Sequence, residues 1–303
     1  MGMLDLKLSD LLLFFQNSGV KYHATGHAVD TDKKIVGFSS IYHTEPNTLS
    51  WMTTQALDWS GIKASVMICS ANAELPENTD LTFIAVDNPK NAFALALREY
   101  CSSTSPAGIS DTAIVGTNCE IGEGVFIGDY SVIGNGVKIG DRTRILSHVT
   151  IHDQVTIGRD CTIHSGAVVG TDGFGYERDA DGTSFKIPHI GGVVIEDGVE
   201  IGSNSCIARG VLSNTVIRKN VKIGNLTHIS HNVYVGENTM ITHQAHIGGS
   251  LTIENDCWIA PGSVYKQGLT IGRNSVTGLG AVVIRDVPPY ETVAGVPAKS
   301  IKK

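Results

Sequence analysis

The chain has 303 residues, of which 17% are charged and 42% hydrophobic, a composition typical of a folded soluble protein and not of a disordered one. Its formal net charge is -7, so no overall positive field attracts nucleic acid or an anionic membrane. The apolar run from Leu11 to Phe15 is far too short to span a bilayer, and no basic signal region precedes it. We therefore expect a cytoplasmic protein without membrane insertion. The six scattered cysteines show no paired spacing, so neither a disulfide framework nor a zinc knuckle is expected.

The first third of the chain carries helix and strand signals in alternation. "LSDLLLFFQNSG" predicts a helix with Ser9 as a possible N-cap and Gly19 beyond its end. "ASVMIC" and "LTFIAV" predict strands. "NPKNAFALALREYC" predicts a second helix, capped by Asn88 with Pro89 at its first position. Residues 1–104 are thus expected to form a small α/β domain, followed by the linker "SSTSPAG".

Beyond this linker an aliphatic residue recurs at every sixth position. The series runs from Ile109 to Val169 and, after an interruption, from Ile195 to Val283 with one slip of four residues. Glycine or another small residue often follows the aliphatic one, as expected where a short strand ends in a tight corner. Such a period predicts a solenoid, because each unit can bury its aliphatic residue only by stacking on the next unit.

The solenoid is expected to cover residues 105–286 and to be followed by a tail, residues 287–303. The interruption at about 171–192 is rich in Gly, Asp and aromatic residues and is too long for a corner, which predicts an excursion able to wall a groove.

The six-residue motif resembles the hexapeptide repeat of left-handed parallel β-helices, whose three-sided coil takes eighteen residues. Three stretches resemble more narrowly the UDP-3-O-acylglucosamine N-acyltransferases of lipid A synthesis: "DGFGYERDADGTSFKIPHIGGVVIEDGVEIG" (172–202), "NLTHISHNVYVGENT" (225–239) and "GGSLTIENDCWIAPGSV" (248–264). The resemblance implies a mainly β fold, a left-handed parallel β-helix preceded by a small α/β domain. The ending "AGVPAKSIKK" is instead similar to that of coenzyme-A-dependent hexapeptide acetyltransferases. Where the family has a second active-site histidine and the aspartate of "IDRG", this chain has Gly268 and Ala208.

One histidine is the candidate catalytic base. Moving an acyl group from a thioester to an amine needs a base that takes the ammonium proton, and the imidazole of histidine suits this task near neutral pH. His231 lies two positions after the repeat residue Ile229, at a corner where side chains point outward. Gly249 follows eighteen residues later and is expected on the same corner of the next coil, where its N–H can donate to a developing oxyanion. The resemblance assigns these two roles to the same two residues.

Other residues are candidates for binding. His228 and His246 are eighteen residues apart, so they are expected to stack on successive coils, and His243 occupies a corner one side further round. Each of the three either contacts the substrate or serves as a spacer. Phe174, Tyr176 and Trp51 either contact the nucleotide sugar or pack within the protein. Gly278, Arg285 and Lys299 either bind the acyl donor or belong to a solvated chain end.

The combined reading is an N-acyltransferase that moves an acetyl or short 3-hydroxyacyl group from acyl-coenzyme A, without a metal, to the amino group of a UDP-, dTDP- or GDP-linked sugar. The product would serve O-antigen or other lipopolysaccharide synthesis. The families resembled form homotrimers with the active site in the groove between neighbouring subunits.

Other functions stay open at this point. An acyl-carrier-protein-dependent lipid A N-acyltransferase and a sugar O-acetyltransferase are the nearest alternatives, since the same histidine can deprotonate a hydroxyl. A γ-type carbonic anhydrase needs a spacing of three zinc-binding histidines that the chain lacks. Sugar-phosphate nucleotidyl transfer needs a larger N-terminal domain with a Gly-rich phosphate loop. A non-catalytic binding solenoid needs neither a corner histidine under a glycine nor an aromatic insertion.

Overall fold

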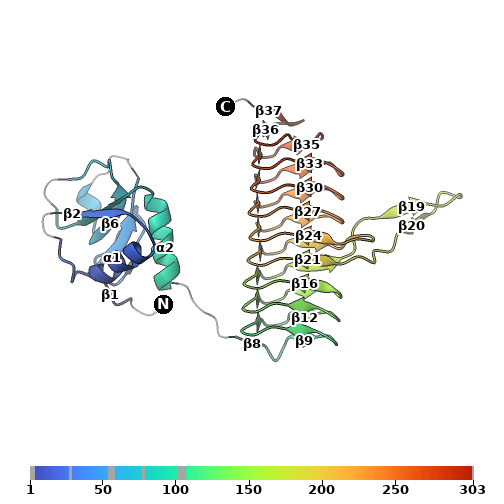
Figure 1. The fold of residues 1–303 in the computed structure, drawn as a ribbon, viewed down its shortest axis with the longest axis horizontal. Coiled ribbons are helices and arrows are strands. Elements are labelled where there is room, and N and C mark those ends of the chain that lie inside the picture. The colour runs from blue at the N-terminus through green and yellow to red at the C-terminus, as the bar shows by residue number, and fades with distance from the viewer. Residues whose placement is uncertain (1–3, 27–28, 54–58, 77–78, 102–106, 302–303) are drawn as a thin grey trace. The chain divides into compact units, whose positions relative to one another are not determined.

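The structure is a computed structural model that describes residues 4–26, 29–53, 59–76, 79–101 and 107–301. The chain forms two compact units, 1–104 and 105–303, and each is described by itself (Figure 1). Most of the segment read as a linker lies outside the described residues. No helix in the described part of the chain is long and apolar enough to cross a membrane.

The N-terminal unit is a sheet with two helices packed on one face. The five-stranded sheet has the order β2-β7-β6-β5-β4, and the helices α1 (Leu8–Asn17) and α2 (Pro89–Cys101) share one hydrophobic cluster with it. The other elements are β1 (Leu6–Lys7), β2 (Tyr22–Thr25), β3 (Lys34–Ile35), β4 (Gly37–Phe38), β5 (Thr48–Trp51), η1 (Trp59–Gly61), β6 (Val66–Ser70) and β7 (Thr82–Val86).

The two helix starts differ in how well the sequence predicted them. Asn88 caps α2 as expected, since its Oδ1 accepts a hydrogen bond from the N–H of Asn91 at 3.0 Å. The N-cap of α1 is Lys7 and not Ser9, so that prediction was wrong. Asp10 accepts a hydrogen bond from the Lys7 N–H at 3.1 Å, and this contact fixes the helix start two residues earlier.

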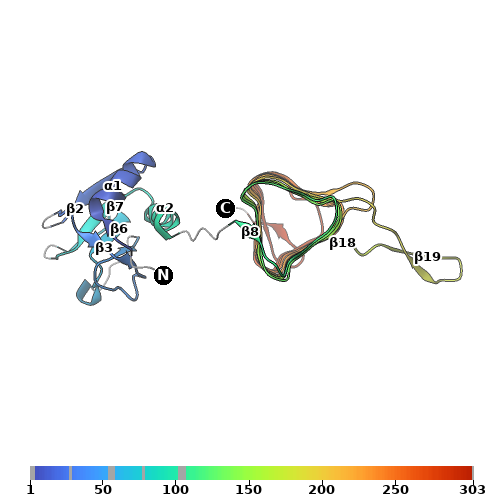
Figure 2. The same cartoon turned by 90° about the horizontal axis from the view of Figure 1, so that it is seen from below.

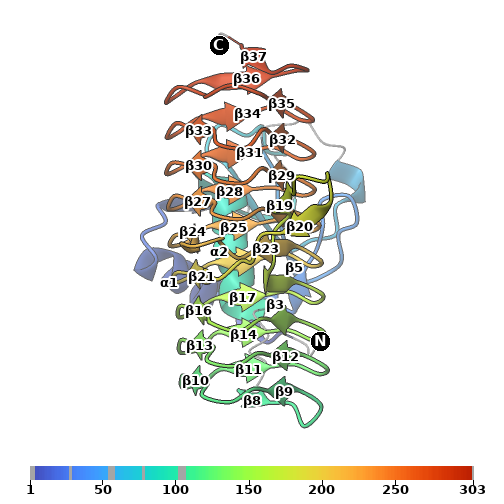
Figure 3. The same cartoon turned by 90° about the vertical axis from the view of Figure 1, so that its right-hand side faces the viewer.

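The C-terminal unit is a parallel β-solenoid with a triangular cross-section (Figure 2), stacked from β8 to the C-terminal strands (Figure 3). Equivalent residues of successive regular coils pair in parallel register eighteen positions apart, as His228 pairs with His246. The repeat aliphatics fill the interior, and Ile229 and Ile247 are fully buried. The predicted solenoid is therefore confirmed, and the left-handed winding is consistent with its hexapeptide repeats.

The solenoid has three faces, here named by their strand number in the described residues. The eight-strand face contains β10 (Glu120–Ile121), β13 (Lys138–Ile139), β16 (Val155–Ile157), β21 (Val193–Ile195), β24 (Thr215–Ile217), β27 (Tyr234–Val235), β30 (Thr252–Ile253) and β33 (Thr270–Ile271). The nine-strand face contains β9 (Ile114–Val115), β12 (Val132–Ile133), β15 (Thr150–Ile151), β18 (Val168–Thr171), β23 (Cys206–Ala208), β26 (His228–Ile229), β29 (His246–Ile247), β32 (Val264–Tyr265) and β35 (Val282–Val283). The eleven-strand face contains β8 (Gly108–Ile109), β11 (Phe126–Ile127), β14 (Arg144–Ile145), β17 (Thr162–Ile163), β22 (Glu200–Ile201), β25 (Lys222–Ile223), β28 (Met240–Ile241), β31 (Trp258–Ile259), β34 (Val276–Thr277), β36 (Thr292–Ala294) and β37 (Lys299–Ser300).

The corners explain much of the polar composition. One residue of most corners has a positive φ, for example Asn204 at 56°, Asn238 at 57° and Asn232 at 59°. Asparagine and glycine tolerate this left-handed conformation better than other residues. Backbone geometry therefore favours asparagine and glycine at these corner positions.

The solenoid is interrupted between β18 and β21. There the chain leaves the corner between the nine-strand and eight-strand faces and forms an antiparallel hairpin of β19 (Tyr176–Arg178) and β20 (Ser184–Lys186). This hairpin projects away from the triangular stack (Figure 2). The insertion therefore starts and ends at the corner that also carries His231.

Candidate active site

His231 lies in the turn between β26 and β27, and glycines contact its ring from two sides. A Cβ added at Gly249 would lie 2.7 Å from Nε2 of His231, and one added at Gly173 would lie 3.0 Å from its Cδ2. Gly249 belongs to the next coil, as the eighteen-residue step predicts, whereas Gly173 belongs to the insertion. A side chain at Gly249 would therefore overlap the imidazole, and one at Gly173 would press closely against it.

Asn232 determines which nitrogen of His231 carries the proton. The amide Nδ2 of Asn232 donates to the carbonyl and hydroxyl oxygens of Ser213 at 3.2 and 2.9 Å. Its Oδ1 accepts from the N–H of Val211 at 3.0 Å and faces Nδ1 of His231 at 3.1 Å. Because Oδ1 can only accept, Nδ1 of the neutral ring must be the donor. The lone pair is then on Nε2, next to Gly249, where a base is needed.

Two peptide N–H groups at this corner, those of His231 and Gly249, differ from their equivalents at several other corners. At those corners the N–H donates to a side chain of the next coil, as Glu237 does to Asn255 Oδ1 at 3.0 Å and Ser203 to Asn225 Oδ1 at 2.8 Å. Gly249 has no side chain to play this role for His231. Within the described part of the chain, neither the N–H of His231 nor that of Gly249 has a hydrogen-bond acceptor. The Gly249 N–H is therefore available to a ligand.

The insertion brings a second histidine to this corner that the sequence did not single out. His189 is 5% exposed, and its ring meets that of His231 edge to face, with centroids 5.5 Å apart and an interplanar angle of 81°. Its Nδ1–H donates to the carbonyl of Ile187 at 2.9 Å. The only available signal was its place in "KIPHIGG" at the end of the interruption.

Ionic contacts fix the base of the insertion. Arg209 donates from Nε to the carbonyl of Gly170 at 2.7 Å and from Nη2 to the carbonyl of Asp153 at 2.8 Å. Asp172 forms an ion pair with Lys186, and the hydrogen bond from Lys186 lowers the pKa of Asp172 while raising that of the lysine. The Asp172–Lys186 pair thus holds the insertion to itself, and the N–H of Ile190, which donates to the carbonyl of Val211 at 2.8 Å, holds its end to the solenoid.

The predicted aromatic contacts of the insertion are accessible. Phe174 is 86% and Tyr176 is 49% exposed, and their rings are paired with centroids 5.0 Å apart. Phe174 lies between Gly173 and Gly175, the latter placed so that a Cβ would come 2.8 Å from Cε1 of His189. The aromatic pair therefore lies next in sequence to Gly173, which contacts the His231 ring. Its contact with a substrate stays a prediction.

The other predicted histidines occupy two different places. His228 and His246 stack on the nine-strand face with centroids 5.0 Å apart and an interplanar angle of 22°. Burial, and secondarily the charge of His246, lowers the pKa of His228. His243 lies on the corner between the eleven-strand and nine-strand faces, where its Nδ1 accepts a hydrogen bond from the N–H of Asn225 at 3.0 Å. It therefore caps a corner and does not join His231.

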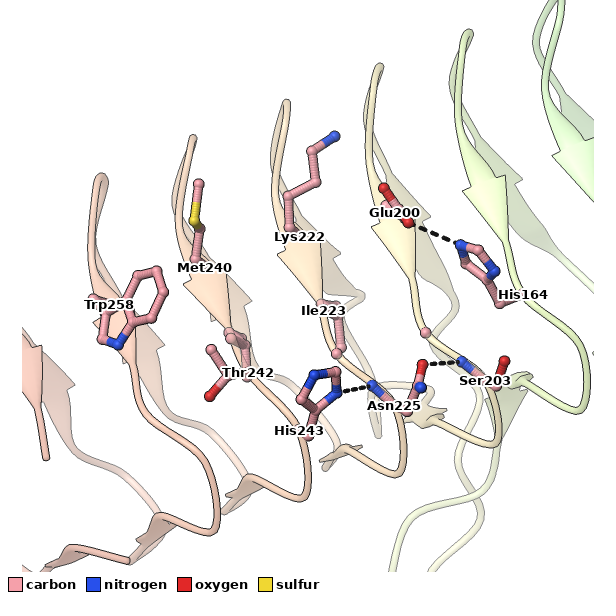
Figure 4. Close-up of a pocket in the computed structure, with 13 residues that line it drawn as sticks. His164, Glu200, Ser203, Lys222, Ile223, Asn225, Met240, Thr242, His243 and Trp258 are labelled. Carbon is pink, nitrogen blue, oxygen red and sulfur yellow. Dashed lines mark hydrogen bonds and ion pairs between the residues drawn. The ribbon is translucent and has the colours of Figure 1, made fainter. Parts of the chain in front are cut away.

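His243 lines a groove of about 400 Å³ on the eleven-strand side (Figure 4). Lys222, Met240 and Trp258 project from successive strands along one side of it. At one end Nε2 of His164 contacts Glu200 at 2.8 Å. The groove runs across several coils and offers an apolar strip, one cation and the free edge of His243.

The remaining candidates are spread over both units. Arg285 and Lys299 line one pocket of about 320 Å³ at the C-terminal end of the solenoid. Gly278 is covered there, since a Cβ added to it would lie 2.8 Å from Cβ of Ala294. Trp51 lies in the N-terminal unit, half-buried, with its ring centroid 6.2 Å from that of Phe93. It belongs to that unit's hydrophobic cluster, and its contact with a base stays a prediction.

Comparisons with known proteins agree with this architecture. The model of the bacterial transferase hexapeptide (six repeats) matches residues 118–153, 136–171 and 214–249. A UDP-3-O-acylglucosamine N-acyltransferase of Caulobacter sp. (strain K31) is 32% identical over 117 residues, which cover 39% of this chain and 34% of the relative. A protein of the same name from Porphyromonas gingivalis (strain ATCC 33277) is 53% identical over 60 residues, 20% of this chain and 17% of the relative. The chain thus spans about a third or less of the length of these curated relatives.

Among solved structures, the LpxA UDP-N-acetylglucosamine acyltransferase from Bacteroides fragilis 9343 matches with a TM-score of 0.58 and 25% sequence identity. The match covers 64% of this chain and 74% of that one. The resemblance to these acyltransferases is thereby confirmed: the chain carries hexapeptide repeats, part of its sequence is similar to UDP-3-O-acylglucosamine N-acyltransferases, and its fold is similar to that of LpxA. The likeness of its ending to coenzyme-A-dependent acetyltransferases stays a prediction.

Proposed function

We propose that this protein is an N-acyltransferase that transfers an acyl group from a thioester to the amino group of a nucleotide-linked sugar. The observation that carries the proposal is the pairing of His231 with Gly249. The base has its proton held on Nδ1 by Asn232 and its lone pair on Nε2, beside a peptide N–H without an acceptor in the described structure. Base and oxyanion donor are the two groups that acyl transfer requires.

The reaction follows from this geometry. The sugar ammonium first loses one proton to water, and the neutral amine nitrogen attacks the thioester carbonyl to form the new C–N bond while Nε2 of His231 takes a second proton from that nitrogen. The Gly249 N–H donates to the oxygen that becomes negative. When the tetrahedral intermediate collapses, the C–S bond breaks and the sulfur leaves with the electron pair. The proton on Nε2 then passes to the departing thiolate, so that the products are an amide and a free thiol and the base is regenerated.

Two surfaces of the solenoid suit the acyl donor. Coenzyme A carries several phosphates, and Arg285 and Lys299 share a pocket at the C-terminal end with the carboxylates of Asp286 and Glu291. The groove that contains Met240 and Trp258 offers an apolar strip for an extended acyl or pantetheine chain. A homotrimer would let such a groove on one subunit face the His231 corner of a neighbour, so we include the trimer in the proposal.

A second candidate is the lipid A reaction itself. The curated relatives bear the name UDP-3-O-acylglucosamine N-acyltransferase, and this name supports a UDP-linked acceptor about as well as it supports the first candidate. An acyl-carrier-protein donor is part of this second candidate. The His231 corner is compatible with both, because the base and the oxyanion donor act on an amine and a thioester, which the two reactions share. The choice between the two candidate functions therefore depends on which substrates the protein accepts and not on its catalytic residues.

A donor-by-acceptor matrix tests both candidates. Acetyl- and 3-hydroxyacyl-coenzyme A and the matching acyl carrier proteins are each combined with UDP-3-O-acylglucosamine and with UDP-, dTDP- and GDP-linked amino sugars, and thiol release is followed. Product mass spectrometry then locates the acyl group on nitrogen or oxygen. Transfer to nitrogen supports the proposal, and transfer only to a hydroxyl contradicts it.

A further inference from the structure

His189 is buried beside the candidate base but has no part in the reaction steps above. Its ring is 5% exposed, and one of its two nitrogens is satisfied by the Ile187 carbonyl at 2.9 Å. The other nitrogen, Nε2, is buried and has no hydrogen-bond partner in the described structure. Burying an unpaired acceptor costs free energy, so hydrogen bonding alone does not explain an imidazole at this position.

The packing of the ring offers an explanation. His189 meets His231 edge to face at 5.5 Å and 81°, and both rings lie under the same glycine. A Cβ at Gly173 would be 3.0 Å from Nε2 of His189 and 3.0 Å from Cδ2 of His231. The free space around the base is therefore bounded on this side by His189 and the Gly173 backbone.

The wall formed by His189 is itself fixed. The N–H of Ile187 donates to the carbonyl of Gly175 at 3.0 Å, and the carbonyl of Ile187 holds Nδ1 of His189. Gly175 passes directly over the ring, with room for no side chain. The end of the hairpin, the glycine segment and His189 thus form one closed unit.

We propose that His189 is a positioning residue for His231. Its ring blocks rotation of the His231 imidazole away from Asn232, so that Nδ1 stays within hydrogen-bonding distance of Oδ1 and Nε2 stays beside Gly249. The shape of the His189 ring is what blocks the rotation. A buried imidazole whose Nε2 makes no hydrogen bond is therefore explained by its shape. The catalytic consequence rests on the proposed function, whereas the orientation of His231 does not.

Two substitutions separate the ring from its hydrogen bond. His189→Phe keeps a flat ring at the wall but loses the bond to Ile187. His189→Asn keeps a donor near the position of Nδ1 but removes the outer part of the ring. The proposal expects crystal structures in which Phe retains the contact of His231 Nδ1 with Asn232 Oδ1 and Asn loses it. Retention in the Asn variant or loss in the Phe variant would overturn the proposal. If the Asn variant does not fold, as judged by its thermal melt, the Phe variant decides alone.

Kinetics give an independent readout once a substrate pair is known. Misorientation of a base lowers kcat by ~10- to 100-fold, so the Asn variant should lose kcat at unchanged KM while the Phe variant stays near wild type. A merely structural role of the Ile187 bond predicts the reverse order. His148→Asn, at an exposed position with φ of 60° that asparagine tolerates, is the matched control and should change neither constant. Failure of every donor and acceptor would defeat the proposed function, but the crystal structures would still decide the role of His189.

Discussion

Oδ1 of Asn232 lies 3.1 Å from Nδ1 of His231, and the two residues are adjacent in the chain. The asparagine backbone has a φ of 59°, the left-handed conformation that asparagine tolerates. Its amide cannot flip without losing the contacts to Ser213 and Val211. A residue chosen for corner geometry therefore also sets the tautomer of the candidate base.

Replacing Asn232 should impair turnover without unfolding the solenoid. Glycine adopts the left-handed backbone freely, so Asn232→Gly removes the acceptor with little strain, and kcat should fall by ~10- to 100-fold as His231 loses its orientation. Asn232→Asp keeps an acceptor facing Nδ1 and should retain more activity. Steady-state kinetics of both variants check this order. Equal activity of the Gly variant and wild type would show that Asn232 does not orient the base.

Gly249→Ala should strongly impair acyl transfer, because the added methyl keeps the thioester carbonyl away from the peptide N–H. The added Cβ would lie 2.7 Å from Nε2 of His231 and would occupy the space where the thioester carbonyl must sit. The expected loss in kcat is ~10²- to 10³-fold, the scale of a lost oxyanion donor. Gly61→Ala adds the same methyl where no atom lies within 4 Å and serves as the control. Unchanged thiol release by the Gly249 variant would remove this glycine from the mechanism.

His228 should make stability depend on pH in the range just below neutrality. Burial and, to a smaller extent, His246 lower its pKa in the folded protein, so the unfolded chain binds the proton first as the pH falls. The free energy of unfolding is unaffected at higher pH, decreases as the pH falls below the ordinary histidine value of about 6.5, and levels off below the folded pKa.

His228→Asn removes this contribution, so the variant should lose less stability than wild type between pH 8 and pH 5. Urea unfolding followed by circular dichroism at the two pH values measures the difference. Because burial is the larger cause, His246→Asn should recover only a smaller part. Identical pH dependence of wild type and His228→Asn would contradict the assignment.

Features that follow the repeat could be predicted from the sequence, whereas the contacts of Asn232 and His189 with His231 could not. The six-residue step identified the solenoid, and the eighteen-residue step correctly paired His228 with His246 and placed Gly249 against His231. The role of Asn232 follows from a backbone conformation that no period reveals. His189 was missed because the insertion shifts the residue count, so no fixed spacing relates it to His231.

The stacked core should respond differently at its middle and at its first coil. Ile247 is fully buried between neighbouring coils, whereas Ile109 is 47% exposed at the first coil. Because each coil of a solenoid packs only on its neighbours, Ile247→Ala should lower the free energy of unfolding by about 2–5 kcal/mol. Ile109→Ala should cost about 1 kcal/mol or less, as expected for a partly exposed site. Urea denaturation of the two variants measures both values. An equally large loss at Ile109 would mean that this side chain is covered in solution, since only a buried methyl group can contribute that much.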